Sequence, residues 1–379
     1  MDNPTTTRQL TAFLKWAGGK EQELKHILPL VPTFDTYYEP FVGGGAVLFS
    51  MQPHKKYIND KSTELFNLYT LIAQNKQDFF VSLDQLLLGW QTISRIVDTQ
   101  ALYLTKIYKA YSDGISSHKE LADALLDFIQ HHEKAFTGMF AMFYNKDTDN
   151  FIRELQKNLL SKTRRMRELE NKKWRLPERD IVRNIECALK SGFYMHIRHL
   201  YNKIAEYQIA PGVAGALFFF VRENAYASMF RYNSRGEFNV PYGGLSYNRK
   251  DIAKKIEYIK SPILQCYLRD AVIENLDFEA FLLQYPPQKN DFIFLDPPYD
   301  SEFSTYAQNE FSMEDQERLA RYLLDRCEAK FMLIIKNTPA ILALYSHPKV
   351  QVKMFNKKYL VSFQNRNDKD VEHLVVMNY

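Results

Sequence analysis

The stretch "FIFLDPPYD", residues 292–300, ends an apolar run with an acid, two prolines and a tyrosine. The apolar residues predict a buried strand. Pro297 and Pro298 stiffen the turn after it, because each proline fixes its φ angle and lacks an N–H. Asp296 and Tyr299 are then expected at the carboxyl end of a strand, where open α/β sheets bind their ligands. The alternative is a strand-ending turn with a surface aspartate, so the motif needs support from the rest of the chain.

The residues that follow predict a helix between two buried strands. "SMEDQERLARYLLDRCE", residues 312–328, is expected to form a helix with Ser312 as its N-cap, and "KFMLIIKN", residues 330–337, the next strand. This alternation is typical of a largely parallel sheet covered by helices, so the predicted fold class is α/β. Two later stretches, 351–363 and 371–379, are expected to pair as an antiparallel hairpin at the sheet edge.

The composition is that of a globular protein: of 379 residues, 46% are hydrophobic and 25% are charged. The apolar runs are too short to span a bilayer and the first residues are unlike a signal peptide, so we expect a cytoplasmic protein with no membrane partner. Cys187, Cys266 and Cys327 are far apart in the chain. Their spacing predicts a reducing compartment and no metal site.

The net charge of +4 is too small to indicate a polyanionic partner, but the bases are unevenly distributed. Between Arg153 and Arg183 they outnumber the acids, and Trp174 lies among them. These bases include Lys162, Arg164, Arg165, Arg167, Lys172, Lys173 and Arg175. The cluster fits either of two interpretations, a surface that neutralises phosphates or the solvated face of a helix.

The charged cluster belongs to a long segment, about 76–210, that is poor in Gly and Pro. Its apolar residues recur at helical spacing, as Leu121, Leu125 and Phe128 do. We therefore expect a mostly helical insertion in the α/β fold.

A second motif, "YYEPFVGGGAVLFS" at residues 37–50, predicts a strand that runs through a glycine-rich turn into a helix. Glycines at such a turn let the backbone approach a nucleotide closely. Asp60 ends the next short strand, at the place where nucleotide-binding α/β folds hold ribose hydroxyls. A tight turn without a ligand is the alternative for the glycines alone.

The motifs for polyphosphate ligands are incomplete. "GGK" at 18–20 is followed by Glu21 and not by Ser or Thr, and Leu48 stands where a dinucleotide motif has its third glycine. An aromatic residue, Phe41, and nearby carboxylates suit a cationic adenosine ligand better. S-adenosylmethionine is such a ligand, and we expect it as the cofactor.

The corner at Asp296 suits methyl transfer to the exocyclic amine of a nucleobase. That amine is a poor nucleophile because its lone pair is delocalised into the ring. The Asp296 carboxylate and the Pro297 carbonyl would accept its two hydrogens, while Tyr299 stacks on the base. The rigid prolines keep both acceptors in position, which accounts for most of the expected acceleration. Because the amine lies inside a duplex, the base must first be flipped out.

Four motifs in this order resemble the Dam-type (D12) DNA adenine-N6 methyltransferases of bacteria and phages. They are "FLKWAGGK" (13–20), "EPFVGGGAV" (39–47), "RYNSRGEFNVPYG" (231–243) and "DPPY" (296–299). The resemblance covers about the first 75 and the last 170 residues. It implies a Rossmann-like S-adenosylmethionine-dependent methyltransferase sheet with a mostly helical target-recognition domain inserted.

The resemblance also implies domain bounds. The catalytic domain is expected at residues 1–75 and 263–379, and the target-recognition domain at 76–262. The latter would contain the helical insertion of about 76–210 and a DNA-reading hairpin at about 226–245.

Site residues follow from the same resemblance. The catalytic positions are Asp296, Pro297, Pro298 and Tyr299. The cofactor-binding positions are Trp16, Lys20, Glu39, Phe41, Gly43, Gly45, Asp60 and Asp296. Phe303 and Tyr306 fall in a segment that closes over the flipped adenine in relatives, with a plain helix-entry loop as the alternative.

The hairpin residues are expected to bind DNA. Arg231 matches the arginine that reads a guanine, whose O6 and N7 suit its bidentate fork. Tyr226 matches an aromatic wedge and Met229 an apolar base contact. Asn233, Arg235 and Asn239 belong to the same segment, where a hairpin held by its own turn bonds is the alternative.

Family members commonly read GATC, but this chain departs from their pattern at two places. Ala227 stands where relatives with that specificity often carry an amide, and Gly244-Leu245 replaces a polar pair. The outer base pair of the site is therefore left open.

The predicted function is site-specific methyl transfer from S-adenosylmethionine to N6 of a flipped-out adenine in duplex DNA, within GATC or a related site. Expected partners are double-stranded DNA and a cognate restriction endonuclease, with the enzyme a monomer on DNA. The alternatives are an NAD-dependent oxidoreductase, methylation of another amine (cytosine N4, an RNA base or a protein glutamine), and an inactive DNA-binding module of the same fold. The order of the motifs and the Arg231 hairpin favour duplex adenine.

Overall fold

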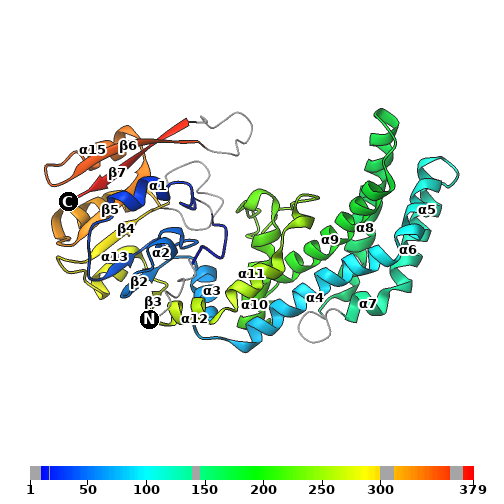
Figure 1. The fold of residues 1–379 in the computed structure, drawn as a ribbon, viewed down its shortest axis with the longest axis horizontal. Helices are drawn as coiled ribbons and strands as arrows, with labels where there is room; N and C mark the ends of the chain where they lie inside the picture. The colour runs from blue at the N-terminus through cyan, green and yellow to red at the C-terminus, as the bar shows by residue number, and fades with distance from the viewer. Residues whose placement is uncertain (1–9, 17, 139–145, 299–310, 359–369) are drawn as a thin grey trace, which may run out of the picture. The chain divides into compact units, whose positions relative to one another are not determined.

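The chain forms two compact units (Figure 1). The computed structural model describes residues 10–16, 18–138, 146–298, 311–358 and 370–379. Unit 1 comprises Met1–Asn75, Phe230–Gly236 and Tyr258–Tyr379, and unit 2 comprises Lys76–Met229 and Glu237–Glu257. Unit 1 carries a β-sheet, whereas unit 2 is mostly helical.

Unit 1 is built around a seven-stranded sheet with the strand order β3-β2-β1-β4-β5-β7-β6. The strands are β1 (Tyr37–Glu39), β2 (Lys56–Asn59), β3 (Val272–Glu274), β4 (Phe292–Leu295), β5 (Lys330–Lys336), β6 (Gln351–Lys358) and β7 (Asp370–Met377). β3, β2, β1, β4 and β5 run parallel to one another, and β7 runs antiparallel between β5 and β6. The predicted α/β class, the largely parallel sheet and the C-terminal hairpin at the sheet edge are confirmed.

The helix predicted to follow Ser312 begins with a capping box. The Ser312 hydroxyl accepts the Asp315 N–H at 3.3 Å, and the Asp315 carboxylate accepts the Ser312 N–H at 2.9 Å. This capping box satisfies two backbone donors that the first turn would leave open, and it confirms Ser312 as the N-cap. The helix then continues as a π-helix, Tyr322–Arg326, which the sequence did not predict.

The helices of unit 1 connect the strands of the sheet. They are α1 (Leu24–Ile27), the 3-10 helix η1 (Leu28–Leu30), α2 (Ala46–Met51), α3 (Thr63–Ala73), α12 (Pro262–Arg269), α13 (Phe278–Gln284), α14 (Met313–Arg321), the π-helix η5 (Tyr322–Arg326) and α15 (Pro339–Leu344).

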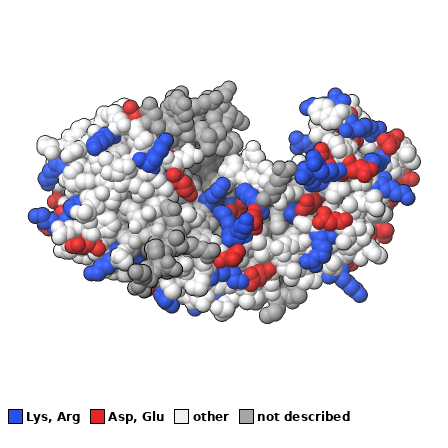
Figure 2. Space-filling model, viewed as in Figure 1, with Lys and Arg blue, Asp and Glu red and all other residues white. Residues whose placement is uncertain are grey.

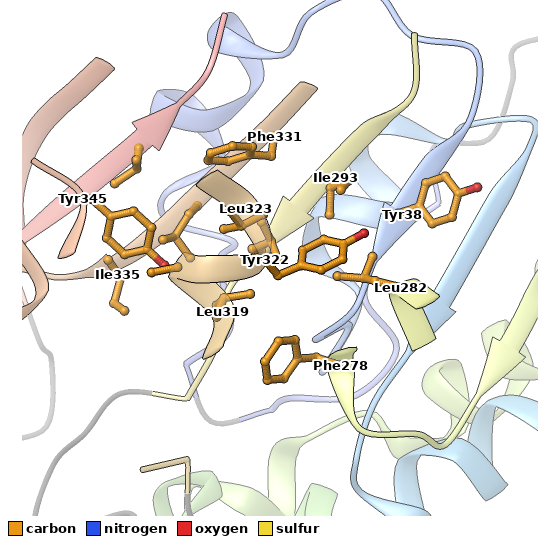
Figure 3. Packing of buried hydrophobic residues seen from close by; sticks show 14 of the residues in the cluster. Tyr38, Phe278, Leu282, Ile293, Leu319, Tyr322, Leu323, Phe331, Ile335 and Tyr345 are labelled. Atoms are coloured by element: carbon orange, nitrogen blue, oxygen red, sulfur yellow. The ribbon is translucent and has the colours of Figure 1, made fainter. Parts of the chain in front are cut away.

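The core on one face of the sheet lies against α13, α14 and α15 (Figure 3). Tyr38, Ile293 and Phe331 of the strands meet residues of these helices such as Phe278 and Leu319. The intervening strand residues, such as Tyr37, Phe292 and Met332, are also buried. Because side chains alternate along a strand, both faces of the sheet are covered, which explains why strand sequences such as "FIFL" are continuously apolar.

One strand of the sheet carried no sequence signal. β3 has only three residues, all of them half-buried, and it pairs with β2 at the sheet edge. A strand this short contains too few residues for an alternating or continuously apolar pattern to emerge.

Unit 2 confirms the mostly helical segment predicted for about 76–210. Its helices are α4 (Gln77–Thr99), α5 (Ala101–Ser112), α6 (His118–His131), α7 (Glu133–Gly138), α8 (Thr148–Lys172), α9 (Glu178–Asn202), α10 (Pro211–Asn224), and the 3-10 helices η2 (Tyr226–Ser228) and η3 (Tyr247–Arg249). α11 (Ile252–Ile259) begins in unit 2 and ends in unit 1.

The packing of unit 2 follows the predicted helical spacing. Leu121, Leu125 and Phe128 are all buried on α6. Near the middle of the unit, the Trp90 ring makes edge contacts with Phe193 and Phe220, at centroid distances of 5.9 and 5.4 Å. Within the described ranges, every helix is too short or too polar to serve as a membrane span.

Candidate active site

A cavity of about 660 Å³ in unit 1 brings together all eight positions that the sequence assigned to a cofactor. Its lining includes Trp16, Lys20, Glu39, Phe41, Gly43, Gly45, Asp60 and Asp296. The cavity lies at the carboxyl ends of β1, β2 and β4, and the strand order reverses between β1 and β4. Open α/β sheets bind ligands at such a point, because the loops that leave neighbouring strands there turn to opposite faces.

The catalytic motif lies only partly within the described residues. Asp296, Pro297 and Pro298 line the cavity. Tyr299, Phe303 and Tyr306 lie outside the residues that the structure describes.

The glycine-rich turn between β1 and α2 forms one wall of this cavity. Gly43 and Gly45 have φ angles of +49° and +75°, in the left-handed region that favours glycine. Gly44 is constrained by space, because a Cβ there would lie 2.7 Å from the Leu14 carbonyl oxygen. The turn can therefore pack directly against the "FLKW" segment, and two of the four motifs meet.

Asp60 is tied to this turn. Its carboxylate accepts the N–H groups of Gly43 and Ser62, each at 2.9 Å. Loss of hydration raises the pKa of Asp60 to about 6, and the two N–H donors oppose that rise. A carboxylate has about four lone-pair sites, so Asp60 keeps acceptor capacity toward a ligand hydroxyl.

Glu39 is a second carboxylate of the cavity and is buried. It accepts the Tyr37 hydroxyl at 2.9 Å. Burial raises the pKa of Glu39 well above its ordinary value, the Tyr37 hydrogen bond lowers it, and the negative charges of Asp296 and Asp60 raise it further. Three carboxylates near one cavity disfavour one another's ionised forms, and a cationic ligand would relieve that repulsion.

Asp296 forms an ion pair with Lys20. The Lys20 side chain is 3% exposed and that of Asp296 19%. The Lys20 ammonium group also donates to the Gly18 carbonyl at 3.0 Å. On the other side of the corner, the Pro298 carbonyl accepts from the Gln316 side chain at 3.3 Å. The "DPPY" corner is thus held from both sides, and the acid is neutralised within the protein.

Sequence reasoning missed Asn59, at the end of β2. Its side-chain N–H₂ group donates to the carbonyls of Pro40 and Leu276, both at 3.0 Å, and its side-chain oxygen accepts the Leu276 N–H at 2.8 Å. One amide thereby connects the loops that leave β1, β2 and β3 at the cavity. A single asparagine in a short strand has no motif that could have pointed to this role.

Two aromatic groups flank the cavity. Phe41, Phe278 and Phe311 have ring centroids 5.5 to 5.7 Å apart. Trp16 makes an edge contact with Phe230 at 5.0 Å, and Tyr232 follows at 5.3 Å from Phe230. Phe230 and Tyr232 were not predicted as pocket residues, because their motif indicated DNA reading alone.

The expected DNA-reading residues fall in both units. Arg231, Asn233 and Arg235 lie in the Phe230–Gly236 segment of unit 1. The side-chain oxygen of Asn233 accepts the Arg235 N–H at 3.0 Å, and the Asn233 carbonyl accepts the Gly236 N–H at 2.9 Å. Asn233 therefore performs the turn-stabilising task that was the alternative for this segment.

Tyr226, Met229 and Asn239 lie in unit 2. An antiparallel bridge joins Ala225 to Tyr242, and the Tyr226 N–H donates to the Pro241 carbonyl at 2.8 Å. The Tyr226 side chain is 48% exposed, as a residue that contacts DNA must be.

The tip of this segment is strained. Ala227 and Ser228 have φ angles of +52° and +53°, although neither is glycine. The buried Arg222 of α10 donates to the Met229 carbonyl at 2.8 Å. Arg222 thus holds the end of a backbone turn that its own residues disfavour, which costs about 1–3 kcal/mol per residue. An arginine within the apolar run of α10 gave no sequence signal for that role.

The fold and the cavity define an α/β protein with a ligand-sized cavity at the carboxyl edge of its sheet. Residues 16–188 and 179–363 match the family described as D12 class N6 adenine-specific DNA methyltransferase, so the chain belongs to this family and is an adenine-specific DNA methyltransferase. The match also includes the whole segment of about 76–210, which carried none of the four motifs.

Similar proteins extend over nearly the whole chain. The Type II methyltransferase M.CviBI of Paramecium bursaria Chlorella virus NC1A is 26% identical over 97% of this chain and 99% of its own length. The Type II methyltransferase M.MjaIII of Methanocaldococcus jannaschii is 25% identical over 98% of this chain and 100% of its own. The DNA adenine methylase of Escherichia coli strain K12 is 22% identical, over 97% and 94%.

Proposed function

We propose that the cavity of unit 1 binds S-adenosylmethionine and that the Asp296–Pro297 corner holds the N6 amine of a flipped-out adenine beside it. The observation that carries the proposal is that the glycine-rich turn, Asp60 and Asp296 line one cavity at the point where the strand order reverses. In this proposal unit 1 is a Rossmann-like methyltransferase sheet, because the run β3-β2-β1-β4-β5 has the order of nucleotide-binding halves.

The residues of the cavity suit this donor. A volume of about 660 Å³ lies within the ordinary range for a small-molecule site. Asp60 has lone pairs to accept ribose hydroxyls, and the ring of Phe41 offers an apolar wall to the adenine. When bound, S-adenosylmethionine supplies a methyl group that its positive sulfonium already activates. That charge would offset the repulsion between Glu39, Asp60 and Asp296.

The corner residues would orient the amine. Asp296 and the Pro297 carbonyl accept its two hydrogens, which concentrates the nitrogen lone pair on the side of the donor. In the structure the Asp296 carboxylate is already paired with the Lys20 ammonium group. For the amine to bind, it must share or replace the ammonium hydrogens on that carboxylate.

We infer that unit 2, together with the Phe230–Gly236 segment, reads the target sequence. Arg231 would contact a guanine, Tyr226 would wedge into the base stack, and Met229 would contact a base. Asn239 would contribute from the same segment. Arg235 would contact the backbone or a base edge, whereas Asn233 shapes the turn. The target is proposed to be GATC or a related site.

The proposal for the biological setting rests on the names of two relatives. M.CviBI and M.MjaIII are named Type II methyltransferases. On this basis we propose that the enzyme protects sites that a cognate endonuclease cuts. We also propose that it acts as a monomer on DNA.

Paired substitutions at two carboxylates test the proposal. Asp60→Asn should weaken the binding of S-adenosylmethionine by about tenfold or more, because a hydrogen bond to a charged group contributes about 1.5–3 kcal/mol. Asp296→Ala should abolish methyl transfer while DNA affinity stays within a few-fold of wild type. Calorimetry measures donor binding, and mobility shift measures DNA binding.

Asp270→Asn is the matched control, because Asp270 is exposed and does not line the cavity. It should leave both donor binding and turnover unchanged. Retained turnover in Asp296→Ala, with DNA binding lost instead, would refute the role of the corner.

A further inference from the structure

The positive charge of the molecule is concentrated in residues 153–183. This segment has eleven Lys and Arg against five Asp and Glu, a net charge of +6, where the whole chain has +4. The rest of the chain is therefore slightly acidic. Figure 2 shows Lys and Arg gathered around the end of α8, at the upper right of the view.

Arg164, Arg167 and Arg175 contact other side chains of unit 2. Arg164 contacts the His118 ring nitrogen at 2.7 Å, the Arg167 guanidinium lies 4.5 Å from the centre of the Tyr111 ring, and Arg175 pairs with Asp113 at 2.7 Å. Their partners belong to α6, α5 and the residue that follows α5. The contacts of Arg164 and Arg167 attach α8 to its neighbours, and Arg175 forms its ion pair just after α8 ends, so these three basic residues are explained without any ligand.

Lys162, Arg165 and Lys172 form a different group, here called the basic stripe. At helical periodicity, spacings of three and ten residues place them on one side of α8. Leu169 occupies the same side and is 43% exposed. The stripe contains no acid, although Glu168 is exposed beside it. At 1.5 Å per residue it extends about 15 Å, the length of about four base pairs at 3.4 Å each.

Lys162, the half-buried member of the stripe, lies beside α9, whereas Arg165 and Lys172 are exposed. One turn before Lys162, the Asn158 side-chain oxygen of α8 accepts the Ser191 hydroxyl of α9 at 2.8 Å. Burial raises the pKa of the Cys187 thiol on α9, and the positive charge of Lys162 opposes that rise, so the two side chains are near one another. One turn before Cys187, Arg183 lines a groove of about 650 Å³ in unit 2 together with Asp180 and Glu186, and it pairs with Asp180 at 3.9 Å. The opposite wall of this groove includes Leu245 and Asn248, directly after the reading segment.

The position of that wall is fixed by a hydrogen bond. The Tyr242 hydroxyl donates to the Asn248 side-chain oxygen at 2.6 Å, and Tyr242 is the residue that bridges to Ala225. The reading segment and α9 therefore form two walls of one groove, and α8, which carries the basic stripe, packs against α9, all within unit 2.

We propose that the basic stripe binds the phosphate backbone of the substrate duplex outside the recognition site. The proposal rests on the proposed reading of duplex DNA by the neighbouring segment. Duplex DNA carries one negative charge per about 1.7 Å of its axis, so the phosphates of a duplex extended along the stripe would meet all three basic side chains. The stripe would lengthen the footprint by about four base pairs and add affinity without sequence preference.

The test uses the full-length triple variant Lys162→Gln, Arg165→Gln, Lys172→Gln. Two duplexes contain the sequence that the wild-type enzyme methylates, one ending at that site and one extending beyond it on both sides. Wild type should bind the longer duplex more tightly, and the variant should lose this advantage. On the longer duplex, the slope of log K against log salt concentration should fall by about 2–3, because three phosphate contacts are lost.

The control is Lys25→Gln, Lys55→Gln, Lys289→Gln, which removes the same charge from exposed positions of unit 1. It should keep both the length advantage and the salt slope. An unchanged slope and length advantage in the stripe variant would overturn the proposal and leave the stripe for another partner, such as a protein. Failure of the proposed function is seen separately, as absent methyl transfer by the wild type on the short duplex.

Discussion

At the scale of single residues, Asp60 links structure to donor binding most directly. Its carboxylate receives two backbone N–H groups and yet has a pKa raised to about 6 by loss of hydration. An acid with a raised pKa is protonated over part of the weakly acidic range. A protonated Asp60 offers fewer acceptor sites to a ribose.

We therefore predict that donor affinity depends on pH through Asp60. Well above pH 6 the carboxylate is ionised and binding should be constant. As the pH falls below about 6, protonation should raise the dissociation constant of S-adenosylmethionine, approaching tenfold per pH unit. Calorimetry between pH 5 and 8 measures this dissociation constant. Asp60→Asn should bind weakly with no such dependence, and a variant that keeps the wild-type profile would show that another group titrates.

Arg231 carries the second prediction at this scale. Arg231→Ala should weaken discrimination at one base pair by about 1–3 kcal/mol, because the bidentate contact to guanine is lost. Methylation rates on substrates with single base-pair changes measure it. Lys254→Ala removes an equal charge from an exposed side chain and should leave discrimination intact. Equal weakening on all sequences by Arg231→Ala would assign this arginine to the phosphate backbone.

Which residues could be predicted depends on whether their role has a local motif. Asp296 ends a strand beside two prolines, Asp60 ends the strand that follows the glycine-rich turn, and the structure brings both to the cavity. Asn59 and Arg222 act through hydrogen bonds to carbonyls that are distant in sequence or formed by an irregular loop. No pattern of neighbouring residues encodes such partners, so these two residues could be found only in three dimensions.

At the scale of elements, the glycine-rich turn fixes how β1 passes into α2. Gly45 has a φ angle of +75°, and a Cβ there would lie 2.6 Å from a Phe49 ring carbon and 2.7 Å from the Tyr69 hydroxyl oxygen. Both the backbone conformation and the neighbouring side chains therefore exclude a side chain at Gly45.

Gly45→Ala should destabilise unit 1 by more than the conformational cost alone. Gly18→Ala provides the comparison, because Gly18 has a φ angle of +78° but no atom within 4 Å of its Cβ position. We expect about 1–2 kcal/mol for Gly18→Ala from the left-handed backbone alone. Gly45→Ala should cost about 1–3 kcal/mol more, from overpacking. Denaturant unfolding measures both, and equal losses would show that crowding at Gly45 is relieved by small movements.

Elements with strong periodicity were predicted well from sequence. β4, β5, the C-terminal hairpin and the capped α14 follow from apolar runs and from Ser312 as an N-cap. β3 and the π-helix after α14 were missed. β3 is only three residues long. The hydrogen bonds of a π-helix span one residue more than those of an α-helix, and the apolar pattern of a five-residue segment is too short to distinguish the two.

At the scale of the whole molecule, the sequence indicated the family but not how residues divide between the units. Phe230–Gly236 lies between stretches of unit 2 along the chain and yet belongs to unit 1. Phe230 and Tyr232 line the cavity proposed for the donor, beside Trp16, while Arg231 is their immediate neighbour. Residues proposed for the donor site and for sequence reading therefore alternate in one short segment.

The central claim is that the Asp296–Pro297 corner activates the adenine amine within a cavity that already holds the donor. The most direct measurement is the single-turnover rate of label transfer from S-adenosylmethionine to adenine N6 in a substrate duplex, for wild type and Asp296→Asn, at saturating donor and DNA. The account predicts a rate at least about 10²-fold lower in Asp296→Asn, with donor and DNA affinities near those of wild type. A rate within a few-fold of wild type, with both ligands bound, would contradict it.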